Sequence, residues 1–496
     1  MFYLFLTAAQ SSRSLWYDEL FTYYIAKAPS LGQLWQDIHL DLNPPLMYLI
    51  ERLSLNIFGD HLYTARVPSM LGFLLGSLCF YKFVANRLGF WYGIVALVFF
   101  WASPFEYFAT EARPYGVVVG LFGVAMLAWQ QSTGARRSAL SLMAFALAIL
   151  TMMCTHLLAL FYVVPFGIAE LYRWYRTRRF DLPTWASLVV PAAIPFVYTS
   201  LMSRYGQSAF PASTQASPAK ILGFFYRMLE PQGLFVLFAL CLGLLVSYRG
   251  ARPTNRDLQE HSFSKQEWIF IWSLFLIPVL INFAMMRSHG IAYPRYSGPA
   301  VLLLSILFAV LLGLSTGFSR SAAAAASCVL LLYLAGANAG SALGAVHALR
   351  TRGAQPEPGA VAKIRPDLPL VAASGLKFLE MDKYSDPGTI SRLYYLTGRA
   401  LAIQYAHATI FEGMPDIKEK FPIRAHVEPY EHFVAEHPSF LVLGEMYYPE
   451  DWLLRRLSDI HASLQFLGNY SGAQLYLVTM PGHPVPEITD SLPVAH

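Results

Sequence analysis

Two adjacent carboxylates, Asp18 and Glu19, lie in the aromatic and aliphatic stretch SLWYDELFTYY near the start of the chain. A carboxylate beside a water-filled cavity can accept a proton from a hydroxyl group or hold a divalent cation. The neighbouring Trp16 and Tyr17 are residue types that anchor a segment at the level of lipid headgroups. The alternative is that both acids are solvated charges at the edge of a membrane.

A second group of charges, Glu106, Glu111 and Arg113, lies in the stretch SPFEYFATEARPYG. Such residues are commonly exposed loop charges. Their strongly apolar flanks favour burial in a cavity, where an unpaired charge is costly. Glu111 and Arg113 are too close along the chain to face each other on a helix, so they would serve different ligands.

Two further polar clusters interrupt apolar sequence. His156, in TMMCTHLLALFY, is either a packing residue or a ligand, and a single histidine in such a place is more often the former. His289, Arg295 and Tyr296 lie in RSHGIAYPRYSGPA. Arginine at a membrane edge can extend its charge to water, or its planar guanidinium can bind two oxygens of a phosphate.

The composition defines the class of protein. Of 496 residues, 55% are hydrophobic and only 14% are charged, with a mean hydropathy of +0.42, which excludes an ordinary soluble enzyme and indicates a polytopic membrane protein. The four cysteines lie in apolar runs without metal-type spacing, so they predict neither disulfides nor zinc. The net charge of +5 comes from the apolar part of the chain, and nucleic acid is not implied.

Ten apolar runs approach the ~20 residues that a helix needs to cross a bilayer. They are 67–84, 90–108, 115–129, 139–155, 157–172, 184–202, 234–246, 268–286, 299–314 and 322–340. The opening run MFYLFLTAAQ is about half that length, so we expect that a first helix is truncated here and that its start lies upstream.

Basic connections indicate the cytoplasmic side, because positive residues are retained there during insertion. Every second connection carries such residues, at 85–89, 134–138, 173–180, 249–265 and 315–320. The alternate connections, the acid pair at 18–19 and everything after 341 are then predicted to face outside. The stretch 19–62 carries charges that break any lipid-facing stripe, and Pro44 and Pro45 would start a helix or fix a turn. It predicts short interfacial helices rather than a span.

The composition changes near the end of the apolar part. We expect a transmembrane bundle over 1–346, a Pro- and Gly-bearing linker over 347–365, and an α/β domain over 366–496. Strands are predicted at 369–374, 391–397, 439–445, 463–468 and 473–480, with helices at 414–421 and 449–464. The predicted fold is mainly α, a polytopic helical bundle with outer-face interfacial helices and a C-terminal extracytoplasmic α/β domain.

Six stretches in this order, SLWYDELFT, DLNPPLMYL, FGDHLYTARVPSML, SPFEYFATEARPYG, CTHLLALFY and AYPRYSGPA, resemble the GT-C membrane glycosyltransferases. The resemblance is to the bacterial relatives of the protein O-mannosyltransferases and aminoarabinose transferases, which are similar to glycosyltransferase family 39. It implies transfer of a sugar from a polyprenyl-phosphate donor to a lipid, protein or glycan acceptor. Transfer would occur at the outer face of the bacterial inner membrane, with inversion at the sugar.

The resemblance also implies roles for single residues. Asp18 corresponds to the catalytic carboxylate and Glu19 to its partner, and Glu111 with Asp18 to the position where some members hold a divalent metal cation. Arg295, with Arg113 and Tyr296, corresponds to the site of the donor phosphate. The remaining candidates are Glu106, His156, His289 and Asn43, and many relatives have histidine where this chain has Asn43.

Two other functions are compatible with a membrane protein of this kind. A transporter or lipid-linked-sugar flippase would show paired repeats and polar residues near the middle of the bilayer. Here no repeat is visible and the notable charges gather at one surface. A scaffold whose outer domain binds envelope partners would lose its function on deletion of 366–480 but not on loss of Asp18.

Overall fold

The computed structural model describes residues 7, 11, 13–41, 43–134, 137–198, 211, 214–230, 238, 261–288, 290–350, 361, 364–470 and 472–485. His289 lies outside these residues, as does the predicted run 234–246 except for Phe238. The chain divides into two compact units. The first comprises Met1–Ser12, Ile25–Met202 and Ala216–Leu349, and the second comprises Arg13–Tyr24, Ser203–Gln215 and Arg350–His496.

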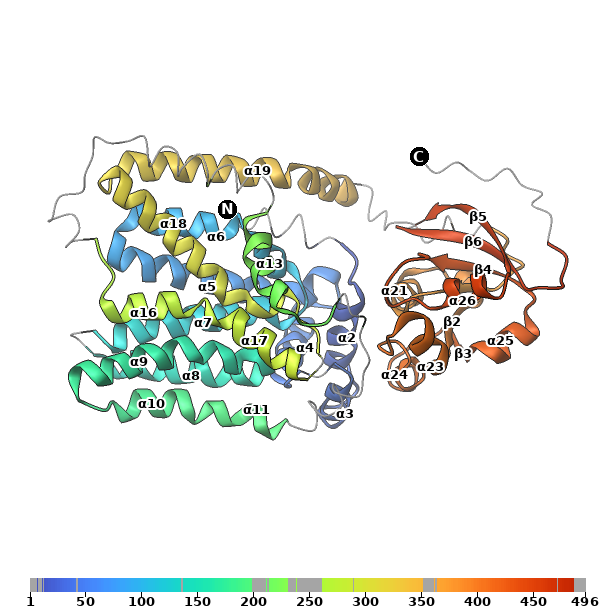
Figure 1. Cartoon of the computed structure of the whole chain (residues 1–496), viewed down its shortest axis with the longest axis horizontal. Coiled ribbons are helices and arrows are strands. Elements are labelled where there is room, and N and C mark those ends of the chain that lie inside the picture. The colour runs from blue at the N-terminus through green and yellow to red at the C-terminus, as the bar shows by residue number, and fades with distance from the viewer. Residues whose placement is uncertain are drawn as a thin grey trace. The chain divides into compact units, whose positions relative to one another are not determined.

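The first unit is a helical bundle, in which Figure 1 shows α7 beside α8 and α9 beside α16. Its core is aromatic, with the rings of Phe166 and Phe270 4.7 Å apart and those of Trp129 and Phe270 5.0 Å apart. In chain order its elements are α3 (Leu31–Asp37), η1 (Ile38–Leu40), α4 (Leu46–Phe58), α5 (Leu62–Leu88), α6 (Phe90–Trp101), η2 (Pro104–Thr110), α7 (Pro114–Ser132), α8 (Ala139–Thr155), η3 (Leu157–Val163), α9 (Val164–Thr177), α10 (Leu182–Val189), η4 (Pro191–Ala193), α11 (Ile194–Val197), α13 (Pro218–Leu229), α16 (Lys265–Ser273), α17 (Leu276–Arg287), η5 (Pro294–Ala300), α18 (Val301–Thr316) and α19 (Arg320–Arg350).

Five helical segments of the described chain are long and apolar enough to cross a membrane, which is fewer than the ten runs of the sequence. They are Leu62–Leu88, Leu157–Thr177, Lys265–Arg287, Pro294–Thr316 and Arg320–Gly340, and a sixth is counted if α6 and η2, bent by 78°, are one span. The run at 184–202 is instead divided into α10, η4 and α11, because Pro191 and Pro195 lack the amide that would continue a helix. The chain is a multi-pass membrane protein.

The expected interfacial helices are present between 31 and 58. One face of α4 is buried through Tyr48, whereas Leu49, Leu53 and Ile57 on the opposite face are 38%, 58% and 62% exposed. Their spacing of four residues forms an apolar stripe along the helix. A stripe of this kind suits a helix that lies in the boundary between lipid and water.

Helices α5 and α7 pack backbone against backbone through small residues. A Cβ at Gly116 would lie 2.5 Å from the Ser69 carbonyl oxygen, and one at Gly72 would lie 2.6 Å from the Val117 Cα. A Cβ at Gly120 would collide with the Gly72 carbonyl oxygen. Small residues four apart allow membrane helices to approach this closely, so the pair fixes where the residues before α7 lie.

We expect Gly120→Ala to destabilise the bundle by about 3 kcal/mol, because the added methyl meets backbone that cannot rotate away. The matched control is Gly167→Ala in α9, where an added Cβ has no atom within 4 Å and no loss is expected. Thermal unfolding of the two purified variants in one detergent measures the difference. Equal unfolding temperatures would show that the close approach of α5 and α7 is not required.

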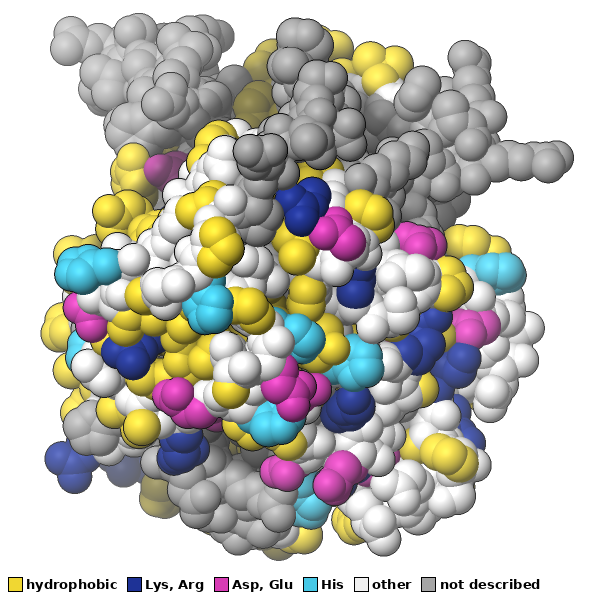
Figure 2. Space-filling view, turned by 90° about the vertical axis from the view of Figure 1, so that its right-hand side faces the viewer, with side chains coloured by type: hydrophobic (Ala, Val, Ile, Leu, Met, Phe, Trp, Pro, Cys, Tyr) yellow, Lys and Arg dark blue, Asp and Glu magenta, His cyan; other side chains and the backbone are white. Residues whose placement is uncertain are grey.

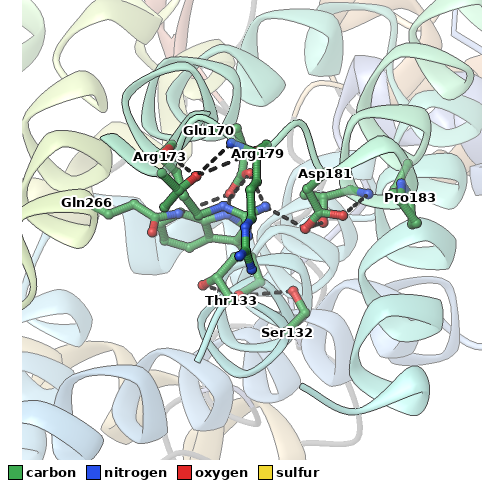
Figure 3. A network of polar contacts seen from close by, with 12 residues as sticks. Ser132, Thr133, Glu170, Arg173, Arg179, Asp181, Pro183 and Gln266 are labelled. Carbon is green, nitrogen blue, oxygen red and sulfur yellow. Dashed lines mark hydrogen bonds and ion pairs between the residues drawn. The ribbon is translucent and has the colours of Figure 1, made fainter. Parts of the chain in front are cut away.

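Figure 3 shows a network of polar contacts that includes Glu170, Arg173 and Asp181. Glu170 is 1% exposed and accepts hydrogen bonds from Trp129 Nε1 at 2.8 Å and Gln266 Nε2 at 3.0 Å. Arg173 pairs with Glu170 and, at 2.6 Å, with Asp181. The network ties α7, α9 and α16 together, so part of the basic charge in the predicted inside connections neutralises buried acids.

The second unit contains a six-stranded sheet in the order β3-β2-β1-β4-β6-β5. β1, β2, β3 and β4 are mutually parallel, whereas β6 is antiparallel to both β4 and β5. On the face of this domain drawn in Figure 2, basic, acidic and histidine side chains are mixed with hydrophobic ones. The strands are β1 (Leu370–Ala372), β2 (Leu393–Thr397), β3 (His426–Pro429), β4 (Ser439–Gly444), β5 (Ser463–Tyr470) and β6 (Ala473–Thr479). The helices are α2 (Tyr17–Ala26, of which the part to Tyr24 is in this unit), α21 (Gly375–Tyr384), α22 (Pro387–Ile390), α23 (Arg399–Leu401), η6 (Ala402–Ala406), α24 (Met414–Lys420), α25 (Tyr430–Glu436) and α26 (Leu453–Asp459).

The five predicted strands and the two predicted helices of this domain are present. The strand missing from the prediction is β3, whose four residues HVEP include a proline and show no apolar alternation. It is a strand because its partner β2 supplies the pairing, from Tyr394 with His426 to Thr397 with Pro429.

Asp451 makes the stability of this domain depend on pH. Burial raises the pKa of its carboxyl from 3.8 to about 8, and Glu450 adds to the rise. The folded state therefore binds more protons than the unfolded chain between these values, so stability is greatest below the lower value and is lost as pH rises through about 8. Asp451→Asn should raise the unfolding temperature of the domain more at pH 8 than at pH 5.

Calorimetry of the full-length protein measures this difference. The control is Glu419→Gln, which removes an exposed carboxylate and should change neither temperature. A gain from Asp451→Asn of the same size at both pH values would contradict the assignment of a protonated carboxyl.

Candidate functional site

η2 and the connection from it to α7 carry three of the predicted site residues. Glu106, Glu111 and Arg113 are 6%, 1% and 5% exposed, so they are buried rather than exposed loop charges. Arg113 is the N-cap of α7, and its carbonyl oxygen accepts a hydrogen bond from Ser69 Oγ at 2.7 Å. The helix begins at Pro114 because proline is favoured at a first helical position. The packing of α5 against α7 therefore positions Arg113.

Arg113 is paired with an acid that the sequence analysis did not select. Its Nη1 lies 2.6 Å from Asp41 Oδ2, and both side chains are largely buried. Tyr48 Oη donates to the same oxygen at 2.9 Å, and Asn43 Nδ2 donates to the Asp41 carbonyl at 3.2 Å. The sequence pattern that could have indicated this acid is Asp41 and Asn43 before the double proline, with Tyr48 after it. Asn43 is thus connected to the site through Asp41.

Arg295 lies among aromatic rings. Its guanidinium carbon is 4.6 Å from the centroid of Tyr293, 5.6 Å from Tyr115 and 5.7 Å from Tyr296. These are cation–π distances, and they hold a planar cation in one orientation. Tyr162 Oη donates to the Tyr296 carbonyl at 2.5 Å, which ties η5 to η3.

η5 is also held against η2, because Gly298 packs directly on the ring of Phe105 and a Cβ at this glycine would overlap that ring. The ring of Phe105 is fully buried at 1% exposure. This contact fixes the spacing between the segment that carries Arg295 and the segment that carries Glu106.

His156 lies between α8 and η3, outside both apolar helices, and is 6% exposed. Burial lowers the pKa of its imidazole from 6.5 to about 3, and the nearby guanidinium groups of Arg113 and Arg295 lower it further. Its Nδ1 accepts the Leu158 amide at 3.1 Å, so in the neutral ring Nε2 carries the proton. Its ring lies 6.1 Å from Tyr296. His156 is therefore a neutral hydrogen-bond donor beside two cations.

Asp18 and Glu19 belong to the other unit, in the first turn of α2. Asp18 is half-buried, whereas Glu19 is fully buried. Glu19 Oε2 accepts the Trp16 amide at 3.2 Å, and the Trp16 carbonyl accepts the first helical hydrogen bond at 2.9 Å. Glu19 thus caps the N-terminus of α2, as a glutamate at the third helical position often does.

Among the comparisons with known proteins, only the comparison with solved structures gives matches, and these identify the fold. No family model matches the chain, and no curated protein matches it. Apo ArnT from Cupriavidus metallidurans superimposes with a TM-score of 0.54 at 14% identity, covering 96% of both chains. The structure of that protein bound to undecaprenyl phosphate gives 0.52 at 15% identity, again covering 96% of both chains. This chain has the ArnT fold.

The ArnT fold confirms the fold expected from the resemblance, a polytopic helical bundle followed by a C-terminal domain. Within the bundle unit of this ArnT-like chain, the structure brings Arg113, Arg295, Tyr296 and His156 together. Glu106 in η2 and Glu111 in the connection that follows it are both buried. The roles assigned to these residues stay predictions, as do those of Asp18 and Glu19 on α2.

The divalent metal also stays a prediction. Among the residues that the structure describes, no group of three histidine, cysteine, aspartate or glutamate side chains is placed to hold a metal ion. Among the described cysteines, Cys79, Cys154 and Cys328 are free thiols.

Proposed function

We propose that this protein is an integral-membrane glycosyltransferase that moves a sugar from a polyprenyl-phosphate donor to an acceptor. The ArnT fold supports the proposal, since one of the ArnT structures holds undecaprenyl phosphate. The site is proposed to face the extracytoplasmic side of the bacterial inner membrane, because the basic connections lie at the other end of the bundle. The acceptor is proposed to be a lipid, a protein or a glycan.

The observation that carries the proposal is the environment of His156. Two guanidinium groups and a neutral histidine converge in a buried aromatic setting, which is a suitable site for a phosphate. We assign the donor phosphate mainly to Arg295, because the rings of Tyr115, Tyr293 and Tyr296 hold its guanidinium in one orientation. Its planar guanidinium can bind two phosphate oxygens, and the Nε2 proton of His156 can donate to a third.

The chemistry requires a leaving phosphate and an activated nucleophile. As the bond between the anomeric carbon and the phosphate oxygen breaks, Arg295 would stabilise the negative charge that develops on the phosphate. Asp18 would accept the proton of the attacking acceptor group, and Glu19 would support it. Attack opposite the phosphate would invert the anomeric centre.

A panel of polyprenyl-phosphate sugars, incubated with the purified protein and candidate acceptors, tests the proposal. Mass spectrometry of the acceptor should reveal a hexose or pentose addition for one donor, and the lipid product should be polyprenyl phosphate. A parallel incubation with EDTA, followed by added Mg²⁺ or Mn²⁺, tests the predicted metal. Movement of intact lipid-linked sugar across vesicles without any transfer would favour a flippase instead.

A further inference from the structure

Helix α2 packs its aromatic face against the C-terminal domain within the second unit. The ring of Tyr17 lies 5.5 Å from that of Phe411, and Phe421 lies 5.3 Å from Phe21 and 5.0 Å from Tyr24. Phe411 and Phe421 are both buried. Because aromatic pairs at these distances contribute beyond the area that they bury, the domain holds α2 by a specific surface rather than by a flexible tether.

The end of α21 adds polar contacts to the same helix. The Leu15 amide, just before α2, donates to Tyr384 Oη at 2.9 Å. Lys383 Nζ donates to Tyr23 Oη at 3.3 Å and lies 4.5 Å from the centre of the Tyr23 ring. Tyr384 therefore fixes the chain entering α2, and Lys383 fixes its last turns.

We propose that the C-terminal α/β domain is the element that positions Asp18 and Glu19, with Lys383 and Tyr384 as its positioning residues. The inference rests on the proposed function, because positioning Asp18 and Glu19 matters for activity only if these carboxylates take part in sugar transfer. Asp18 and Glu19 lie between the two anchored ends of α2, so a shift at either end moves both carboxylates.

The electrostatics of the unit agree with this placement. Burial raises the pKa of Glu380, and the carboxylate of Glu19 adds to the rise. Burial likewise raises the pKa of Glu450, with a contribution from Asp18. Each predicted catalytic carboxylate thus has a carboxyl group of the C-terminal domain near it.

The test is the double variant Lys383→Met with Tyr384→Phe, which removes the anchoring groups and keeps the apolar bulk. We expect kcat to fall about tenfold with the KM for the donor unchanged, since misplacement by ~1 Å can cost up to about 10²-fold. Hydrogen exchange in the full-length protein should be faster for the amides of 15–24. Lys383→Arg keeps the cation over the ring and should retain the wild-type kcat.

The matched control is Phe466→Ala, which removes a half-exposed ring from β5 of the same domain and should leave kcat and the exchange of 15–24 unchanged. A wild-type kcat in the double variant, or unchanged exchange at 15–24, would overturn the inference. Asp18→Asn, purified and assayed in the same way, distinguishes failure of the positioning role from failure of the proposed mechanism. If Asp18→Asn is inactive and the double variant is fully active, only the positioning role fails. If Asp18→Asn is active, the proposed mechanism fails.

Discussion

Asp18→Asn is expected to reduce sugar transfer by about 10²- to 10⁴-fold, the usual contribution of a group that accepts a proton in the transition state. The amide has the same shape as the carboxylate but cannot accept the proton of the acceptor hydroxyl. Because Asp18 is half-buried in the first turn of α2, the change should leave the helix and the unfolding temperature of the protein nearly unaltered. The measurement is transfer under saturating donor and acceptor, beside thermal unfolding.

Glu19 provides the control for this experiment. Glu19→Gln preserves the hydrogen bond to the Trp16 amide, because glutamine serves as well as glutamate at this capping position. Glu19→Ala removes that bond. If Glu19 only caps α2, the glutamine variant will keep its activity and the alanine variant will lose stability. If Glu19 also supports catalysis, both will lose activity. Near-normal turnover of Asp18→Asn would remove Asp18 from the mechanism.

Arg295→Ala is expected to weaken donor binding by roughly 10- to 100-fold, because a hydrogen bond to a charged group contributes about 1.5–3 kcal/mol. The KM for the acceptor should change little, since the guanidinium is assigned to the donor phosphate. Arg295→Lys should recover only part of the loss, because an ammonium group cannot bind two oxygens in one plane. Titration with polyprenyl phosphate measures donor binding without turnover.

A matched arginine lies elsewhere in the bundle unit. The guanidinium carbon of Arg178 is 4.9 Å from the centre of the Tyr175 ring, a similar cation–π contact in a predicted inside connection. Arg178→Ala removes the same charge and should leave donor binding unchanged. Equal losses of donor and acceptor affinity in Arg295→Ala would exclude its assignment to the phosphate.

The sequence predicted structure best where the burial of apolar residues alone determines the element. Apolar runs of span length predicted α5, α17 and α18, and short apolar stretches bounded by turns predicted β4 and β6. The prediction was less accurate for elements whose structure depends on contacts between residues far apart in the sequence. The strand β3 exists because β2 pairs with it, and the bend of 78° between α6 and η2 appears only in three dimensions.

The candidate site divides in the same way. Burial of Arg113 and Glu111 could be inferred, because their apolar flanks leave few exposed positions. The pairing of Arg113 with Asp41 could not, since 72 residues separate them along the chain. The cap formed by Glu19 was not predicted, because Trp16 stands where the sequence pattern of a capping box has serine or threonine.

The packing of α5 against α7 through glycine residues limits how the proposed lipid donor could enter this bundle. With the carbonyl of Gly72 directly against Gly120, these two helices cannot slide or roll past each other without a collision between main chains. They must move as one rigid body, and Arg113 must travel with them. Any opening that admits the tail of the proposed donor therefore has to come from other elements of the bundle.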